Sequence, residues 1–241
     1  MKFEREYLIG VEDIGKNNKI TNWAFLKYLE EIACSHSATC GYGANDIETK
    51  KRAWLLMDWK LKVIDRPIYE QKLKIQTWAR TISSNCFFSY RDFEVFCEGK
   101  KVAIATSKWV LFDFNTKRIT KLTNDIYGPY NSENVHVFDI EDIEKSKEPS
   151  EKQLNMLYEV RRSDIDINRH MHNLNYLKLA YENLPEDVFF GEELKNVKIM
   201  YKHQVLLGKK VKCYYSNENE KCIITIKSED DRVLHSIIEI Y

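Results

Sequence analysis

Ten residues in the second half of the chain, Asp164 to Asn173, read DIDINRHMHN and contain two carboxylates, two imidazoles and two carboxamides. Histidine titrates near neutral pH and is therefore a natural base for taking a proton from water. A carboxylate beside it can fix its orientation and protonation. The stretch therefore favours acid–base hydrolysis. The structural alternative is that short polar side chains form a turn and cap a helix.

A second stretch of the chain repeats this pattern. Residues 7–31 align without gaps on residues 158–182, with eight identities that include Asp13 with Asp164 and Asn17 with Asn168. Residues 59–75 then match residues 197–213 in hydrophobic pattern. Because unrelated amphipathic segments share a period but not specific polar positions, we interpret the chain as a duplication. The change in offset, from 151 to 138, predicts a longer connection between helix and sheet in the first copy.

The two copies differ within the polar turn at three positions. These are Gly15, Lys19 and Thr21 in the first copy, and Asp166, His170 and His172 in the second. A purely structural turn would need the same residues in both copies. The acid and the imidazoles are instead confined to the second, which is the pattern expected when one copy of a duplicated scaffold keeps an active site.

Each copy predicts a short strand, the polar turn, one helix and then an antiparallel meander. The helices are expected to begin at Asn22 and Asn173, as favoured N-cap residues, and to bury one apolar face each. The strands are expected near residues 54–64, 70–82, 85–96, 101–113, 196–205, 209–217, 221–228 and 232–241. This order predicts an α+β fold in which a sheet wraps around each helix. We expect domains at 1–138 and 154–241, separated by a charged linker at 139–153.

Bulk composition excludes some classes of protein. The 241 residues include 37 basic and 37 acidic side chains, so no net charge favours nucleic acid. No apolar run is long enough for a membrane helix, and the first ten residues do not resemble a targeting signal, so we expect a cytoplasmic protein. The six cysteines form no CxxC pair and do not cluster with histidine, which disfavours a zinc site and predicts reduced thiols.

The stretch DIDINRHMHNLNYL resembles the Asp-x-Asn-x-His-x-x-Asn-x-x-Tyr motif of the acyl-acyl-carrier-protein thioesterases of plant plastids and bacteria. Residues 54–78 and 105–122 resemble first-domain stretches of the same family. The resemblance implies a tandem, or double, hotdog fold that hydrolyses fatty acyl-acyl-carrier protein without a metal or an organic cofactor. It places Asp166, Asn168 and His170 on the family's catalytic positions, and the acyl-chain pocket mainly in the first domain.

The chemistry of thioester hydrolysis assigns a role to each of these residues. His170 would activate or position the water, and Asp166 would fix its orientation and protonation. Asn168 would orient the water or the carbonyl. Asn17 stands at the same position in the first copy, so a structural role for Asn168 is nearly as well supported. Backbone amides near Asn173, at the start of the helix, could polarise the thioester oxygen.

The fourth family position departs from the plant pattern, which has glutamate followed by cysteine in a Tyr-Arg-Arg-Glu-Cys-like stretch. This chain has Gln204 and Val205 there. Gln204 can hold a water but cannot accept its proton, and no cysteine nucleophile is available. Either Asp166 and His170 suffice, or activity is weak, or the alignment is off by one and His203 takes part.

The remaining polar candidates have structural interpretations. We expect Asp164, which the first copy repeats as Asp13, to be a turn or cap residue. We expect His172 to cap the helix or face solvent, because no further His or Cys cluster supports a metal. Tryptophans at 54, 59, 78 and 109 indicate core, although some could line an acyl tunnel.

Basic clusters at Lys50, Lys51 and Arg52, or at Arg161 and Arg162, could receive an acidic carrier protein, although charged runs are more often plain surface. An acyl-CoA thioesterase, a dehydratase on the same fold and a degenerate, non-catalytic acyl-binding protein remain as alternatives. No nucleic-acid or membrane partner is expected. The sequence leaves acyl chain length, saturation preference and homodimer formation open.

Overall fold

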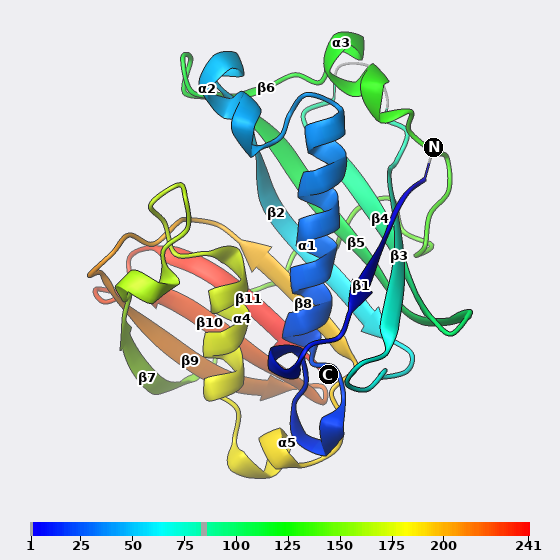
Figure 1. Cartoon of the computed structure of the whole chain (residues 1–241). Helices are drawn as coiled ribbons and strands as arrows, with labels where there is room; N and C mark the ends of the chain where they lie inside the picture. Colours follow the sequence, from blue (N-terminus) through cyan, green and yellow to red (C-terminus); the bar gives the residue numbers. More distant parts are fainter. Residues whose placement is uncertain (1, 83–85) are drawn as a thin grey trace. The chain divides into compact units, whose positions relative to one another are not determined.

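The computed structural model describes residues 2–82 and 86–241 and divides into two compact units, Met1–Ile143 and Glu144–Tyr241. Each unit is one principal helix packed on an antiparallel sheet, as Figure 1 shows. The expected α+β fold with one helix and one sheet per copy is therefore confirmed. The exact domain limits expected from the sequence stay a prediction.

Unit 1 packs α1 (Asn22–Thr39) against a sheet in the order β1-β3-β4-β5-β2, with β6 paired to β5. Its strands are β1 (Phe3–Leu8), β2 (Arg52–Val63), β3 (Lys72–Ala79), β4 (Ser89–Cys97), β5 (Lys100–Asp113) and β6 (Arg118–Thr120). Short helices α2 (Ile47–Lys50) and α3 (Asn124–Tyr127) lie in its connections, with 3-10 turns at Val11–Asp13, Lys16–Asn18, Ala44–Asp46 and Gly128–Tyr130.

Unit 2 packs α4 (Asn173–Glu182) against a sheet in the order β8-β11-β10-β9-β7. Its strands are β7 (Gln153–Glu159), β8 (Asn196–Tyr201), β9 (Lys210–Glu218), β10 (Lys221–Ser228) and β11 (Leu234–Ile240). A short helix α5 (Glu186–Phe190) follows α4, and a 3-10 turn at Arg162–Asp164 precedes it. The two units therefore share one chain path through the elements that surround the polar turn.

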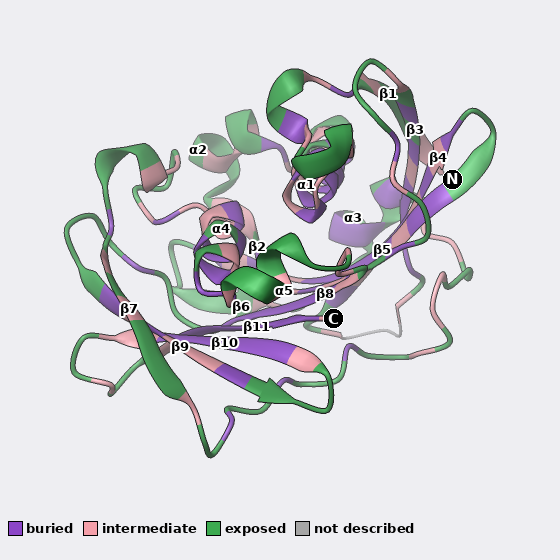
Figure 2. Ribbon diagram, turned by 90° about the horizontal axis from the view of Figure 1, so that it is seen from below, coloured by how far each residue is buried: buried purple, intermediate pink, exposed green. Residues whose placement is uncertain are grey.

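The helix faces expected from periodicity form the cores. In unit 1, Leu26, Leu29 and Ile32 are fully buried against the sheet. In unit 2, Leu177 and Ala180 are fully buried, and Figure 2 shows buried residues along most of β10 and β11. Burying each large aliphatic side chain stabilises the fold by roughly 1.5–3 kcal/mol. The helices are therefore held mainly by this packing, which fixes the turn that precedes each of them.

The longer first copy differs from the sequence expectation in where its extra residues lie. We expected them in the connection between helix and sheet. Instead α1 has 18 residues where α4 has 10, and β2 has 12 residues where β8 has 6. The extra residues thus lengthen regular elements, because His36 and other side chains near the end of α1 remain buried and continue the helix's packed face.

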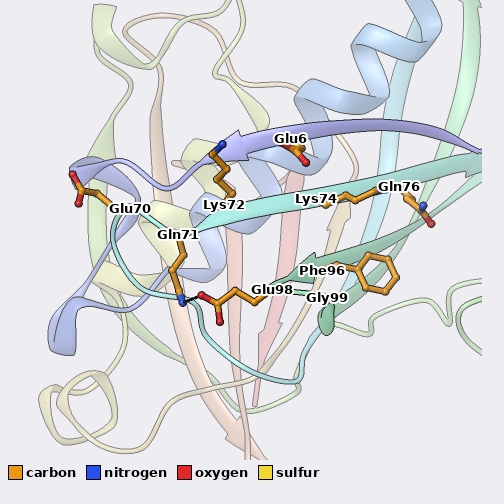
Figure 3. A pocket seen from close by; sticks show the side chains of 9 residues that line it. All are labelled: Glu6, Glu70, Gln71, Lys72, Lys74, Gln76, Phe96, Glu98 and Gly99. Atoms are coloured by element: carbon orange, nitrogen blue, oxygen red, sulfur yellow. Dashed lines mark hydrogen bonds between the residues drawn. The ribbon is translucent and has the colours of Figure 1, made fainter.

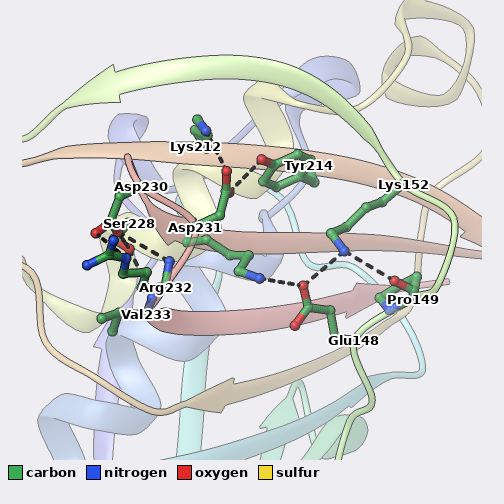
Figure 4. Close-up of polar contacts among 11 residues, drawn as sticks. Glu148, Pro149, Lys152, Lys212, Tyr214, Ser228, Asp230, Asp231, Arg232 and Val233 are labelled. Atoms are coloured by element: carbon green, nitrogen blue, oxygen red, sulfur yellow. Dashed lines mark hydrogen bonds and ion pairs between the residues drawn. The ribbon is translucent and has the colours of Figure 1, made fainter.

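The segment expected to be a charged linker is fixed to its neighbours by polar contacts. In the first part of this segment, the Asp142 carboxylate accepts a hydrogen bond from Lys108 at 2.8 Å. On its second part, Glu148 accepts from Lys152 at 2.9 Å and from Lys227 at 3.0 Å, and Figure 4 shows this cluster. Asp142 therefore forms an ion pair within unit 1, and Glu148 and Lys152 form ion pairs within unit 2.

Candidate active site

The polar turn before the helix has the same backbone hydrogen bonds in both units. Two donor–acceptor pairs of unit 1 recur in unit 2 at the offset of 151: Gly15–Lys19 (2.8 Å) with Asp166–His170 (2.9 Å), and Thr21–Asp13 (2.9 Å) with His172–Asp164 (2.8 Å). The isolated bridge between Ile14 and Ile20 likewise recurs between Ile165 and Met171. The turn is therefore one framework, used twice with different side chains.

A second segment crosses this turn in both units, at the offset of 138. The Ile20 amide donates to the Pro67 carbonyl at 2.9 Å, and the Met171 amide donates to the Val205 carbonyl at 2.8 Å. His170 forms an isolated bridge with Leu206. The structure thus brings the segment that carries Gln204 beside His170, as the alignment of the two copies required.

Asp164 has the structural role expected of it. Its Oδ2 atom accepts hydrogen bonds from the Tyr158 hydroxyl and from the Arg161 amide, both at 2.7 Å. In unit 1, Oδ2 of Asp13 accepts from the Gly10 amide at 2.8 Å in the same way. Both aspartates hold the 3-10 turn that leads into the polar loop, so Asp164 stays outside the candidate site.

The helix caps are one residue earlier than the sequence indicated. Thr21 caps α1, because its hydroxyl accepts from the Ala24 amide at 3.1 Å. His172 caps α4, because its Nδ1 atom accepts from the Leu174 amide at 3.2 Å. Asn22 and Asn173, expected as caps, are instead the first helical residues. Of the two roles expected for His172, capping the helix or facing solvent, the cap is the one observed.

The protonation of His172 is tied to this cap. Burial lowers the pKa of His172 below its ordinary value, and the nearby Asp166 carboxylate offsets part of that effect by raising the same pKa. An unprotonated Nδ1 atom is required to accept the Leu174 amide. The electrostatics therefore favour the neutral ring that the cap needs.

Asp166 fixes the loop in front of His170. Its Oδ1 atom accepts from the Asn168 amide at 2.8 Å and from the His170 amide at 3.2 Å. The Asp166 carboxylate is thus bonded to the backbone of His170, whereas the sequence suggests contact with its imidazole. Such a side-chain-to-backbone turn determines where the following residue places its side chain.

His170 is half-buried, and its backbone is held on both sides. Its carbonyl accepts from the Asp166 amide at 2.9 Å, and its own amide donates back to Asp166 Oδ1. Within residues 2–82 and 86–241, no protein group is hydrogen-bonded to the imidazole. The ring nitrogens are therefore available to water or to a substrate. Asn168 is exposed on the same loop, two residues before His170.

Gln204 is exposed, and its counterpart in unit 1 shows what a side chain there can reach. The offset of 138 makes Arg66 the equivalent residue. Its guanidinium donates to the Ile20 carbonyl at 2.8 Å and to Oδ1 of Asn22, the first residue of α1, at 2.7 Å. A side chain at this position can therefore extend to the helix N-terminus, which in unit 2 begins with Asn173.

The N-terminus of α4 retains a backbone donor. His172 occupies two of the first amides, since its Nδ1 accepts from Leu174 and its carbonyl accepts from Asn175 at 2.9 Å. In the described part of the chain, the Asn173 amide has no protein acceptor. Because a helix N-terminus carries unsatisfied amides and a partial positive charge, this amide can stabilise an oxyanion.

Two tyrosines behind the loop were not among the sequence candidates. Tyr176 is buried, and its ring packs edge-on against Tyr201, with ring centroids 5.6 Å apart. The Tyr201 hydroxyl donates to the Asn173 carbonyl at 3.1 Å. Burial raises the pKa of Tyr176 above its ordinary value. Tyr176 is the last residue of the quoted motif, so that signal was available, whereas nothing in the sequence marked Tyr201.

A groove of about 700 Å³ lies elsewhere, on unit 1, and Figure 3 shows the side chains that line it. Its lining comes from β1, β3 and the β4–β5 turn and includes Glu6, Lys72, Lys74 and Glu98. Gln71 donates to the Glu98 carboxylate at 3.0 Å across it. A lining with so many charged groups does not suit an apolar chain. The groove is therefore not our candidate for acyl binding.

Two further searches concern the described residues only. No three His, Cys, Asp or Glu side chains gather there in a way that could hold a metal ion. No helix there is both long enough and apolar enough to cross a membrane.

Comparison with known families matches most of the chain. Residues 1–130 match the acyl-ACP thioesterase N-terminal domain, and residues 147–239 match the acyl-ACP thioesterase C-terminal domain. The chain is 23% identical over 223 residues to oleoyl-acyl carrier protein thioesterase 2 of Arabidopsis thaliana, covering 84% of this chain and 59% of that protein. A dodecanoyl-[acyl-carrier-protein] hydrolase of Cinnamomum camphora is 23% identical, covering 84% of this chain and 56% of that protein. The chain thus spans somewhat more than half the length of these relatives.

Solved structures show the same fold. An acyl-ACP thioesterase from Bacteroides thetaiotaomicron superposes with a TM-score of 0.88 at 19% identity, over 99% of this chain and 96% of that one. The 12:0-ACP thioesterase from Umbellularia californica superposes with a TM-score of 0.82 at 17% identity, over 99% and 96%. The expected tandem hotdog architecture is therefore confirmed.

Proposed function

Because the chain belongs to the acyl-ACP thioesterase family, we propose that it hydrolyses the thioester of fatty acyl-acyl-carrier protein and releases the free fatty acid. One observation carries the proposal. The two units share a single hydrogen-bonded loop framework, yet only unit 2 places an imidazole, His170, and a carboxylate, Asp166, on it. Since unit 1 folds with Lys19 and Gly15 at those positions, folding alone does not require the acid–base pair.

The geometry supports a general-base mechanism. His170, whose ring has no protein partner in the described residues, takes a proton from the attacking water. Asp166 holds the loop so that this ring faces the substrate, and Asn168 orients the water or the carbonyl. The Asn173 amide donates to the oxyanion that develops on the thioester oxygen. His170 then returns the proton to the leaving thiolate, so that a carboxylic acid and a free thiol result.

Gln204 completes the site by binding the water. Its carboxamide can donate to and accept from a water, but it cannot remove a proton. Proton transfer is therefore assigned to His170 alone. No step in this mechanism needs a metal or an organic cofactor.

The carrier protein is proposed as the partner, with basic side chains as its contact. Lys50 and Lys51 are exposed beside α2, and Arg161 and Arg162 are exposed before the polar loop. Arg52 is committed elsewhere, because it pairs with Asp113 at 2.9 Å. Exposed cations steer an acidic partner mainly through the association rate, which makes the effect sensitive to salt.

A thiol-release assay tests the proposal. Purified protein is given acyl-carrier-protein thioesters of graded acyl length, and the same acyl groups on CoA. We expect release from the carrier-protein thioesters, and His170→Ala should abolish most of it. Lys19→Ala, at the equivalent position of unit 1, is the matched control and should retain activity. Faster release from acyl-CoA would instead make the protein an acyl-CoA thioesterase.

Gln204 favours one second candidate, a non-catalytic acyl-binding protein. The family glutamate is replaced by a group that cannot act as a base. Under this alternative, the protein binds acyl thioesters, releases no thiol above background and is indifferent to His170→Ala. That result would contradict the hydrolytic proposal.

A further inference from the structure

Two buried arginines of unit 1 differ in how their charge is satisfied. Arg80, the residue after β3, donates to the Asp92 carboxylate at 2.9 Å, to the Ile140 carbonyl at 3.0 Å and to the Thr106 hydroxyl at 3.0 Å. Every nitrogen of its guanidinium therefore has an acceptor, and its charge is paired. Arg80 and Asp92 form a buried ion pair, which is the arrangement that burial of a charge normally requires.

Arg91 of β4 lacks such compensation on the opposite, helix-facing side of the sheet. It is 5% exposed. Its Nη1 atom contacts His36 Nδ1 at 2.8 Å and Thr77 Oγ1 at 3.3 Å. Among residues 2–82 and 86–241, no carboxylate pairs with it, and its guanidinium carbon lies 5.7 Å from the centroid of the Tyr130 ring. A guanidinium stays charged in proteins, so this is a buried cation without a carboxylate partner in that part of the chain.

His36 does not supply the missing negative charge. Burial and the adjacent Arg91 charge lower the pKa of His36 to about 3, so its ring is neutral. A neutral ring can accept the Arg91 N–H at Nδ1. Phe3 stacks on this imidazole, with ring centroids 5.0 Å apart, and Tyr130 packs edge-on against it. The surroundings of Arg91 on this side are therefore uncharged and mostly aromatic.

Two more donors lie in the same row of the sheet. Arg91 pairs in register with Ser107 of β5, and Ser107 pairs in register with Trp59 of β2. Side chains of directly paired residues point to the same face. Ser107 is fully buried, and its Oγ accepts from the Trp109 indole at 2.7 Å. Its own O–H has no acceptor in the described residues.

Trp59 adds an unsatisfied donor. Its side chain is fully buried against Phe93, with ring centroids 5.2 Å apart, and its indole Nε1 has no hydrogen-bond partner among the residues that the structure describes. By contrast, Trp78, equally buried on the other face, donates to the Val135 carbonyl at 2.8 Å. A buried donor without an acceptor costs about 1–3 kcal/mol, and native proteins retain few of them.

We propose that Arg91, Ser107 and Trp59 form a donor-lined subsite that binds an acyl tail carrying an acceptor oxygen far from the thioester, either a hydroxyl or a carboxylate. The three side chains lie in one row of the helix-facing surface, and within the described protein Arg91 has no carboxylate partner and the Trp59 N–H has no acceptor. A ligand oxygen would satisfy them. This inference rests on the proposed function and on the expectation, drawn from the family resemblance, that the first domain holds the acyl chain.

The proposed subsite predicts an order of binding affinity for three kinds of acyl tail. A carboxylate compensates the Arg91 charge and accepts charge-assisted hydrogen bonds, so it should bind most tightly. A hydroxyl accepts without compensating the charge, and a methyl group leaves every donor unsatisfied. The predicted order of affinity is therefore carboxylate, then hydroxyl, then methyl.

Calorimetric titration with primary fatty acyl amides tests this order without any turnover, because the neutral amide head leaves the tail as the one place for a carboxylate. Amides with an unsubstituted, an ω-hydroxylated and an ω-carboxylated tail of matched chain length are titrated into the full-length protein. We expect the oxygen-bearing tails to bind at least about tenfold more tightly than the methyl tail. Arg91→Met should abolish the preference for carboxylate, and Trp59→Phe should reduce both preferences while keeping the ring.

Trp78→Phe is the matched control. It removes a satisfied hydrogen bond from the opposite face, so it should lower the thermal midpoint without changing the order of affinities. Trp59→Phe should leave the midpoint nearly unchanged, because the lost N–H had no partner. Equal affinity for all three tails in the wild type, or an unchanged preference in Arg91→Met, would overturn the subsite and show that buried water satisfies these donors.

The same titration separates the two proposals. Selective binding of oxygen-bearing tails by a protein that releases no thiol would contradict the hydrolytic function and leave the subsite standing. Thiol release without any tail preference would contradict the subsite and leave the function standing.

Discussion

The turns before α1 and α4 share one hydrogen-bonded framework and carry different chemistry. Both are closed by the same amide-to-carbonyl bonds, and both are crossed by a second segment that bonds at an equivalent residue. On this framework, unit 1 carries Lys19 and Arg66 where unit 2 carries His170 and Gln204. The comparison separates what the hotdog turn needs to fold from what only one copy carries.

The residues found in unit 2 and not at the equivalent positions of unit 1 are those with acid–base or water-binding capacity. Asp13 and Asp164 recur because both hold the preceding 3-10 turn through backbone amides. His170 does not recur, and the position tolerates a lysine without loss of the bridge to the crossing segment. Exchange of residues between the two copies is therefore a direct test of the proposal that only unit 2 carries catalytic residues.

The largest effect is expected from giving unit 2 the residue of unit 1. His170→Lys should lower kcat for hydrolysis of the acyl-carrier-protein thioester by about 100-fold to 10,000-fold, because a general base is lost. The fold should persist, since Lys19 occupies the same backbone geometry. Thiol release and the thermal midpoint are measured on the same sample.

Lys19→His is the reciprocal control for this exchange. It should change kcat by less than about twofold, which lies within the scatter of surface substitutions. A loss of activity that accompanies unfolding in His170→Lys would show that the imidazole is structural. Equal losses in both variants would remove the asymmetry between the units.

Asp166 is expected to give the next largest effect. Asp166→Ala removes the acceptor of the Asn168 and His170 amides and should lower kcat by about 100-fold, since misplacement of a catalytic group has effects of this size. Asp166→Asn keeps an oxygen at Oδ1 and should recover most of this loss. If the Asn variant is as slow as the Ala variant, the carboxylate charge itself acts in proton transfer.

The duplicated fold was accessible from the sequence because hydrophobic periodicity and repeated polar positions reflect local geometry. The strand at 221–228 was placed at its observed limits, as β10 shows. The extra length of α1 and β2 was assigned to a connection, because the hydrophobic pattern does not show where a packed helix face ends. The helices begin at Asn22 and Asn173 as expected, but their caps lie one residue earlier, since Asn, Thr and His can all accept an amide at the cap.

The candidate site was accessible through residue types but not through contacts. Comparison of the copies drew attention to His170 and Asp166. That Asp166 bonds backbone amides follows from a five-residue loop closure that composition does not encode. The sequence could not predict that Arg91 lacks a carboxylate partner, because its pairing depends on which strands are neighbours and which face each side chain occupies.

The cap residue should affect stability more than rate. His172→Ala removes the acceptor of the Leu174 amide and should cost about 1 kcal/mol of unfolding free energy, whereas His172→Thr, the residue of unit 1, should largely preserve the cap. The pKa of His172 is lowered in the folded state. Its contribution is therefore present above the ordinary pKa of 6.5 and lost as pH falls below it.

Urea unfolding at several pH values measures this difference. The gap in stability between wild type and His172→Ala should narrow as pH falls from 7.5 towards about 5, and that between His172→Thr and His172→Ala should stay constant. A gap that widens on acidification would mean that the protonated ring is stabilising and that the cap is not made through an unprotonated Nδ1.

The smallest effect is expected where unit 2 departs from its family. Gln204→Glu should preserve kcat or raise it by a few-fold, because a carboxylate at this position can bind the same water and also accept its proton.

Gln204→Arg, which introduces the residue that unit 1 has at the equivalent position, is the contrasting variant. In unit 1 that guanidinium occupies the side chain of Asn22 at the helix start, so Gln204→Arg should slow hydrolysis by engaging Asn173. A large drop in Gln204→Glu would place the water elsewhere and move attention to His203, whose carbonyl contacts His235 Nδ1 at 2.9 Å.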